Sequence, residues 1–229
     1  MLRSIAGFVG SFAILASLMV AAPAVVVADD TYCRGEMYGG YYDDLYVPYG
    51  GFCKLVGATV DGNIKVKARA SLVAIDTDVD GNIQGEYAKK IVVRDSNVEG
   101  NVQTKKTAFV KVTKSFVDGD VQAEYVRTVM VLWSRVYGNI QVDHAKLGRL
   151  VDDYVGGDIQ VYKSFFSDKD SFVNRNEVEG NVQVFENRVP LSIYGNEIYG
   201  DLQCKDNYPP PVGGNNMVES DKEDQCRSF

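Results

Sequence analysis

Apolar and polar residues alternate in short stretches along this chain, which is the pattern of half-buried β-strands. The stretches recur around a motif in which one apolar residue lies two positions before a glycine and another lies two positions after it. The motif occurs eight times, with its glycines at Gly62, Gly81, Gly100, Gly119, Gly138, Gly157, Gly180 and Gly200. Successive glycines are 19, 19, 19, 19, 19, 23 and 20 residues apart. A fixed period of this size, built from strand-type residues, is typical of a solenoid.

A second alternating apolar pair precedes the motif, nine and seven residues before the glycine. Its clearest copies are Ile91 with Val93, Val110 with Val112, Val129 with Val131, and Leu191 with Ile193. Each period therefore predicts at least two short strands, and it is too short for a strand followed by a full helix. The sequence predicts an all-β, single-domain parallel β-helix of about eight rungs, each of about 19 residues, over residues 57–204, with a right-handed coil favoured.

Three columns of equivalent residues should run along such a rod. The apolar residues two positions before the glycines, from Val60 to Ile198, should form a buried column. The Asn or Asp after each glycine, from Asn63 to Asp201, should form a hydrogen-bonded ladder, and so should the glutamines from Gln84 to Gln203 on an outer face. We interpret both ladders as structural. The glycine itself should supply a positive φ for the turn between strands.

The N-terminal segment and the overall charge indicate export. Residues 1–28 begin with Arg3, continue with an apolar run from Ile5 to Val27 and end in small residues before Asp29, as in a secretory signal. The run is also long enough for a retained membrane anchor, which stays the alternative. We expect the cleaved chain to be secreted, periplasmic or at the cell surface, without integral membrane association. The formal net charge of −7 and the lack of a basic stripe argue against a nucleic-acid partner.

Four cysteines in an exported chain predict two disulfides, for which three pairings are possible. The local pairing, Cys33 with Cys53 and Cys204 with Cys226, fits best because the two groups would lie at opposite ends of a rod. A β-helix has open edges at both ends that need covering. We therefore predict that residues 29–56 and 205–229 are end caps, each stapled by one bridge.

Three blocks of sequence carry a resemblance to known proteins. Residues 45–55 read Leu-Tyr-Val-Pro-Tyr-Gly-Gly-Phe-Cys-Lys-Leu, residues 200–207 read Gly-Asp-Leu-Gln-Cys-Lys-Asp-Asn, and residues 221–226 read Asp-Lys-Glu-Asp-Gln-Cys. With the repeats between them, these blocks resemble a group of uncharacterised secreted bacterial repeat proteins with Val-x-Gly-[Asn/Asp]-[Ile/Val]-Gln rungs. The resemblance implies export and a bacterial source, and no particular chemistry. The chain also resembles, more loosely, the bactofilins, which are cytoskeletal β-helices, but it differs from them by its signal segment and cysteines.

Few residues suggest catalysis. The one histidine, His144, takes a rung position that holds tyrosine in two other rungs, and we expect it to be an exposed outer residue. The first four rungs carry an acidic column of Asp61, Asp80, Glu99 and Asp118, whose members should lie about 5 Å apart. Such a column could attract a divalent cation, but a solvated acidic edge is the favoured interpretation. We therefore predict no metal and no cofactor, with this column as the one candidate metal site.

Binding is easier to support than catalysis. Tyrosines crowd residues 29–56 and could stack on sugars or pack against a partner. The column Lys67, Glu86, Lys105 and Glu124 alternates in charge and should form a stabilising charge ladder. The sequence thus predicts a non-enzymatic structural or interaction module of the cell surface or extracellular space, with a cell-envelope glycan or protein as partner. The alternative is a β-helix protein that binds or degrades polysaccharides.

Overall fold

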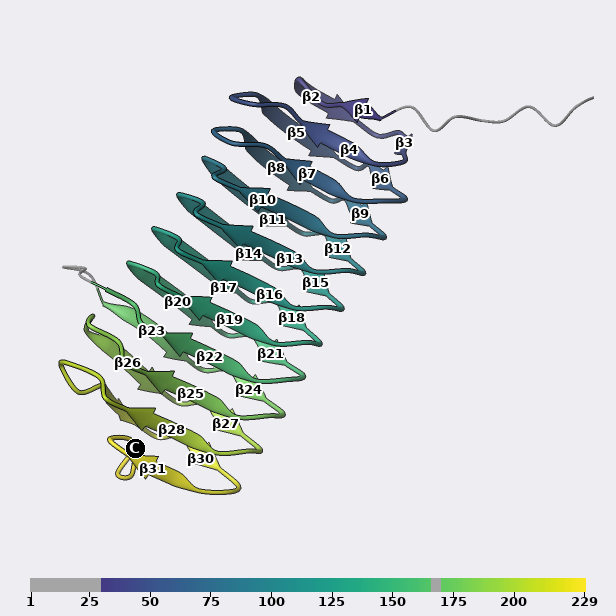
Figure 1. The fold of residues 1–229 in the computed structure, drawn as a ribbon. Coiled ribbons are helices and arrows are strands. Elements are labelled where there is room, and N and C mark those ends of the chain that lie inside the picture. Colours follow the sequence, from purple (N-terminus) through teal and green to yellow (C-terminus); the bar gives the residue numbers. More distant parts are fainter. Residues whose placement is uncertain (1–29, 166–169) are drawn as a thin grey trace, which may run out of the picture.

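The computed structural model describes residues 30–165 and 170–229. The predicted signal segment lies outside the described residues, and so does part of the one extended rung, residues 166–169. The described chain forms a β-solenoid in which three parallel sheets run the length of a rod (Figure 1). Each strand pairs in parallel with the equivalent strand of the next turn. No helix in the described ranges has the length and apolar character needed to cross a membrane.

The strands of each turn contribute in order to sheets A, B and C. Sheet A contains β1 (Thr31–Tyr32), β4 (Leu45–Val47), β7 (Ile64–Val66), β10 (Ile83–Glu86), β13 (Val102–Lys105), β16 (Val121–Glu124), β19 (Ile140–Asp143), β22 (Ile159–Tyr162), β25 (Val182–Phe185), β28 (Leu202–Lys205) and β31 (Lys222–Asp224). Sheet B contains β2 (Gly35–Tyr38), β5 (Phe52–Val56), β8 (Ser71–Ile75), β11 (Lys90–Arg94), β14 (Phe109–Thr113), β17 (Thr128–Leu132), β20 (Leu147–Val151), β23 (Ser171–Asn174), β26 (Leu191–Tyr194) and β29 (Val212–Gly214). Sheet C contains β3 (Tyr41–Tyr42), β6 (Thr59–Val60), β9 (Asp78–Val79), β12 (Asn97–Val98), β15 (Phe116–Val117), β18 (Arg135–Val136), β21 (Tyr154–Val155), β24 (Glu177–Val178), β27 (Glu197–Ile198) and β30 (Met217–Val218).

The rod has about ten rungs rather than the predicted eight, since sheets B and C each contain 10 strands. The two additional rungs come from the segments that the sequence assigned to end caps: Tyr42 pairs with Val60, and Val218 pairs with Ile198. These rungs lack the motif glycine. The first rung passes from Tyr42 to Leu45 through two aspartates, and the last carries Ser220 in place of the glycine. The number of motif glycines is therefore smaller than the number of rungs.

Both predicted local disulfides are present, Cys33–Cys53 and Cys204–Cys226. Each bridge joins a terminal rung to its neighbour, because Cys53 lies in β5 and Cys204 lies in β28. All four cysteines are fully buried. Two disulfides in a chain of this kind indicate an oxidising, extracytoplasmic environment.

The core is built from stacked columns of aliphatic side chains. The predicted inward column of sheet C is confirmed, since Val60, Val79, Val98, Val117, Val136, Val155, Val178 and Ile198 all have 0% exposure. Strand alternation turns their neighbours outward, as for Phe116, which is 49% exposed. Each rung thus adds one layer to a continuous apolar interior.

The motif glycines serve a different purpose from the one predicted. None of them has a positive φ. A Cβ built on Gly100 would lie 2.6 Å from the carbonyl oxygen of Gly81 and 2.8 Å from Asn82 Oδ1. The glycines are therefore needed because successive turns approach each other closely where sheet C leads into sheet A.

Gly100→Ala should destabilise the rod by about 1–3 kcal/mol, because the added methyl group must push two turns apart. Gly148 offers a matched control: a Cβ there meets only Val129 Cγ1 and Val142 Cγ1, both at 4.0 Å. Gly148→Ala should be neutral or stabilising, since glycine is unfavourable inside a strand. Urea denaturation of the two variants checks this, and equal stabilities would contradict the close-approach explanation.

Positive φ angles occur instead at two other corners of each rung, mostly at residues that are not glycine. One column lies between sheets B and C and includes Asp95 (φ 49°), Lys114 (φ 51°) and Trp133 (φ 52°). The other lies between sheets A and B and includes Tyr87 (φ 54°) and Lys106 (φ 53°). A left-handed conformation costs a residue with a Cβ about 1–2 kcal/mol, so the pairing of neighbouring rungs must impose it.

A ladder of polar side chains is buried beside the corner between sheets B and C. Its members are Thr77, Ser96, Ser115, Ser134, Asp153, Asn176, Asn196 and Asn216. The backbone N–H of each rung donates to the side-chain oxygen of the next, as from Ser96 to Ser115 at 3.2 Å and from Asn176 to Asn196 at 2.9 Å. The ladder satisfies backbone donors that would otherwise be buried without a partner.

Candidate functional site

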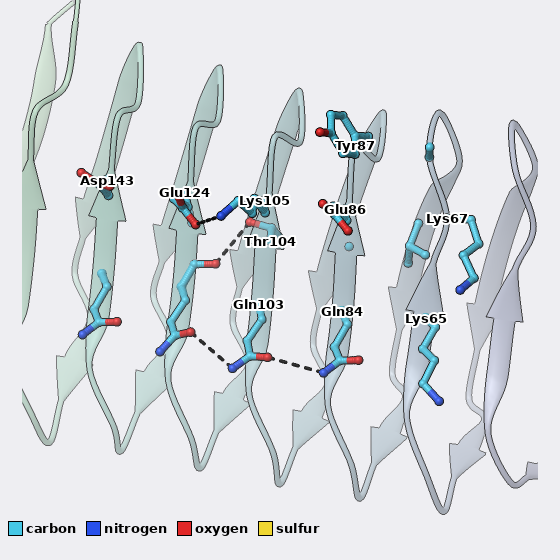
Figure 2. A pocket seen from close by; sticks show the side chains of 16 residues that line it. Lys65, Lys67, Gln84, Glu86, Tyr87, Gln103, Thr104, Lys105, Glu124 and Asp143 are labelled. Atoms are coloured by element: carbon cyan, nitrogen blue, oxygen red, sulfur yellow. Dashed lines mark hydrogen bonds and ion pairs between the residues drawn. The ribbon is translucent and has the colours of Figure 1, made fainter.

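The outer face of sheet A carries the predicted glutamine ladder. Gln84 Nε2 donates to Gln103 Oε1 at 3.5 Å, and Gln103 Nε2 donates to Gln122 Oε1 at 3.3 Å (Figure 2). The ladder is interrupted at Gln122, whose Nε2 donates to Asp120 Oδ2 at 3.1 Å, and it resumes from Gln141 onward. These amides mainly bond one another along the rod, which supports a structural role for the column.

The asparagine ladder beside the motif glycines is also present. Asn82 Oδ1 accepts from the backbone N–H of Asn101 at 2.8 Å and from its side-chain amide at 2.9 Å. At the N-terminal end Asp44 takes the same position, accepting from the Asn63 N–H at 2.7 Å and from Lys65 Nζ at 2.8 Å. These hydrogen bonds lower the pKa of Asp44 to about 2.

The predicted charge ladder is formed in one place among the described residues. Lys105 Nζ lies 2.8 Å from Glu124 Oε2 (Figure 2), and this hydrogen bond raises the pKa of Lys105. The pair is exposed, so its contribution to stability is at most about 1 kcal/mol. Together with the glutamine ladder it lines an open hollow of about 740 Å³ on sheet A.

The acidic column of Asp61, Asp80, Glu99 and Asp118 lies exposed where sheet C leads into sheet A. Desolvation and, after it, a hydrogen bond with the Asp61 carboxyl raise the pKa of Asp80. Asp61 also accepts a hydrogen bond from Tyr41 and thereby raises the pKa of that phenol. Within the described ranges, no group of three or more His, Cys, Asp or Glu side chains has the arrangement of a metal site. At Asp80, the neighbouring charges of Asp61 and Asp78 also contribute to the raised pKa.

Changing Asp80→Asn and Glu99→Gln together should leave the melting temperature unchanged or slightly raised, because it relieves repulsion on an exposed edge. Calcium should have little effect on wild type or variant, since one flat edge supplies too few oxygens for a site of six to eight ligands. Thermal melts with and without calcium measure both effects. A calcium-dependent rise of many degrees in the wild type, absent from the double variant, would show a metal site instead.

A second hollow follows the A–B corner, which we define as the loops that join each sheet A strand to the next sheet B strand. This hollow has a volume of about 670 Å³ and is lined by one cationic residue from each of five successive loops: Arg69, Lys89, Lys106, Arg127 and Lys146. Among the residues that the structure describes, no carboxylate lines it. The corner is therefore locally basic, in a chain whose formal net charge is −7.

Aromatic rings alternate with the cations at the tips of these loops. Tyr87 is 50% exposed and Tyr125 is 45% exposed. Lys106 Nζ donates to the Tyr87 hydroxyl at 2.9 Å and lies 4.9 Å from the centre of its ring. This hydrogen bond raises the pKa of Lys106 and keeps its ammonium charged. Figure 2 shows Tyr87 beyond the end of its sheet A strand, where the corner begins.

His144 lies at the same corner and is only partly exposed, contrary to the prediction. Its ring stacks on that of Tyr125 with 4.4 Å between the ring centres, and Nδ1 lies 2.9 Å from Asp143 Oδ1. Neither contact brings a serine, threonine or cysteine to the ring. The structure thus places the only histidine in a stack of side chains along the rod.

The basic corner is the feature that sequence reasoning missed, and the expectation of no basic stripe is wrong. The five cations are 20, 17, 21 and 19 residues apart and occupy different positions in their loops, so they form no run and no strict column in the sequence. The pattern in the sequence that could have revealed the basic corner is one Lys or Arg per period, always in the loop between the sheet A strand and the sheet B strand.

Comparisons of this chain with known protein families, with curated proteins and with solved structures gave no match.

Proposed function

We propose that this protein is an exported, non-enzymatic rod that serves as a structural or interaction module at the cell surface or outside the cell. The observation that carries the proposal is the repetition of surface side chains in register along the rod. Polar groups on sheet A bond to their counterparts one turn away, as the glutamines do (Figure 2). A surface of this kind suits an extended partner better than a small substrate held at one point.

Export is supported by three features. The two disulfides need an oxidising compartment to form and persist. Residues 1–28 have the composition of a secretory signal. The resemblance to secreted bacterial repeat proteins has the same implication. The partner expected in this setting is a glycan or a protein of the cell envelope.

The charges at the two ends favour a discrete rod over a filament. Asp44 stands at the N-terminal end of the asparagine ladder, and Asp221 stands at its C-terminal end, where its N–H donates to Asp201 Oδ1 at 3.1 Å. Asp30 lies one rung before Asp44, because Thr31 pairs with Leu45. Stacking two copies end to end would therefore bring Asp221 of one copy towards Asp30 of the other, and like charges repel. This separates the chain from the filament-forming role that the bactofilin resemblance suggests.

A panel of neutral and acidic polysaccharides tests the non-enzymatic part of the proposal. Binding on a glycan array, without new reducing ends or unsaturated products after long incubation, is the expected result. If the protein instead degrades polysaccharides, such products should form, and they should be lost in the Asp80→Asn, Glu99→Gln double variant. Depolymerisation that depends on these two residues would refute the proposed function and support the polysaccharide-degrading alternative.

A further inference from the structure

We propose that the hollow along the A–B corner is a groove that binds a linear acidic polysaccharide, one carrying about one carboxylate per sugar or per two sugars. This inference rests on the proposed function, in that it takes binding as the role of the rod. It adds the chemical class of the partner and the surface that holds it.

The described side chains that line the groove carry charge of one sign only. Among the described residues, the charged side chains that line the groove are Arg69, Lys89, Lys106, Arg127 and Lys146, and all are exposed. In the part of the chain that the structure describes, none of the five forms an ion pair with a carboxylate. The carboxylates of Glu86, Glu124 and Asp143 end the adjoining sheet A strands and line the other hollow. A polyanion in the groove would therefore meet five cations, none of which is held in an ion pair within the described ranges.

The spacing of these cations along the rod also suits an acidic polysaccharide. Neighbouring rungs of a parallel sheet lie about 4.8 Å apart, so one cation per rung gives a row of five that spans roughly 20 Å. Duplex DNA carries one charge per about 1.7 Å of axis, a much higher density than this row provides. A polymer of uronic acids spaces its carboxylates at about the length of one sugar or more, which suits one cation per rung. The row thus favours an acidic polysaccharide over a nucleic acid.

The groove also contains exposed aromatic rings. Tyr87 and Tyr125 lie two rungs apart at the loop tips, and both rings are about half exposed. Their positive φ angles of 54° and 53° place both residues at the turn of the loop. Aromatic rings pack against the apolar faces of sugars, and the tyrosine hydroxyl adds a hydrogen-bonding group.

The cellular environment that the disulfides indicate also favours an acidic polysaccharide. The two disulfides indicate an extracytoplasmic environment, where acidic glycans are common polyanions. The formal charge of −7 on the whole chain opposes nonspecific attachment to polyanions elsewhere on the rod. Binding should therefore be confined to one corner and should be sensitive to salt.

The test uses the full chain and immobilised polygalacturonate, with the neutral polymer dextran as the control ligand. Affinities are measured in about 50 and about 200 mM salt, since an electrostatic groove loses affinity as salt rises. The groove variant combines Lys89→Gln, Arg127→Gln and Lys146→Gln. The matched variant combines Arg94→Gln, Lys111→Gln and Lys114→Gln, which removes the same charges from sheet B and the opposite corner. Circular dichroism melts verify that both variants fold.

We expect the wild type and the matched variant to bind polygalacturonate and not dextran, and the groove variant to lose at least about tenfold in affinity. Equal loss in both variants, or no binding by the wild type, would overturn the proposed groove. Tighter binding to a 20-base single-stranded DNA or to phosphatidylglycerol vesicles than to polygalacturonate would overturn the assignment to a polysaccharide. Binding followed by cleavage would leave the groove in place and refute the non-enzymatic function, so the two failures are distinguishable.

Discussion

Replacing Val117 by Asp should lower the melting temperature of the rod sharply, at a cost of about 3–5 kcal/mol in stability. Val117 is fully buried in β15, between Val98 of the preceding rung and Val136 of the next. A carboxylate there would have no partner among aliphatic side chains. Because each rung supports its neighbours, a defect in the middle of the rod should weaken rungs on both sides.

The adjacent residue provides a matched control for this substitution. Phe116 precedes Val117 in β15, points outward and is 49% exposed. Phe116→Asp should change stability by less than about 1 kcal/mol, since its carboxylate would remain in water. Thermal denaturation followed by circular dichroism compares the two. If the Val117→Asp protein had the same melting temperature as the wild type, this column would not face inward.

The second large effect concerns Asp153, the one carboxylate in the buried polar ladder. Burial raises its pKa to about 8, although the N–H groups of Ser134 and Val151 donate to its two oxygens at 2.8 and 3.0 Å. In the unfolded chain the pKa is close to 3.8. The folded state therefore holds a proton that the unfolded state has lost, and this contribution to stability falls as pH rises from about 4 to about 8.

The slope should be about 1.4 kcal/mol per pH unit, which amounts to about 4 kcal/mol between pH 5 and pH 8. Asp153→Asn should remove this slope and be more stable than the wild type at pH 8, because asparagine fills the same ladder at Asn176 and Asn196. Asp118→Asn makes the same change of carboxyl to amide on the exposed edge and should keep the slope. Urea denaturation at several pH values measures it, and parallel curves for wild type and Asp153→Asn would refute a protonated Asp153.

The features that sequence reasoning predicted well are those that repeat with one residue type. The inward valines and the glutamine and asparagine ladders keep their identity from rung to rung, so their columns can be read from the period. The disulfide pairing followed from the positions of Cys33 and Cys204 near opposite ends of the repeats. The glycine was placed at the right turn but for the wrong reason, because a close approach between turns involves two rungs and leaves no mark on a single one.

The features that sequence reasoning missed depend on a shared property rather than a shared residue. The buried ladder needs only a side-chain acceptor, so Thr, Ser, Asp and Asn all fill it. The left-handed corners accept Asp, Lys, Tyr, Trp and His because pairing with the neighbouring rungs imposes the backbone conformation. The basic corner needs one cation per loop, at either of two positions, as Lys106 and Arg127 illustrate. Folding three strands per rung around one axis is what brings such residues together.

The most direct test of the binding account is an amine-labelling footprint of the folded protein with and without polygalacturonate, read by mass spectrometry. Lys89, Lys106 and Lys146 lie in the groove, whereas Lys111 and Lys114 lie on sheet B and at the opposite corner. The account predicts that the polymer slows labelling of the first three lysines and leaves Lys111 and Lys114 unchanged. Equal protection of both sets, or protection of Lys111 and Lys114 alone, would contradict it.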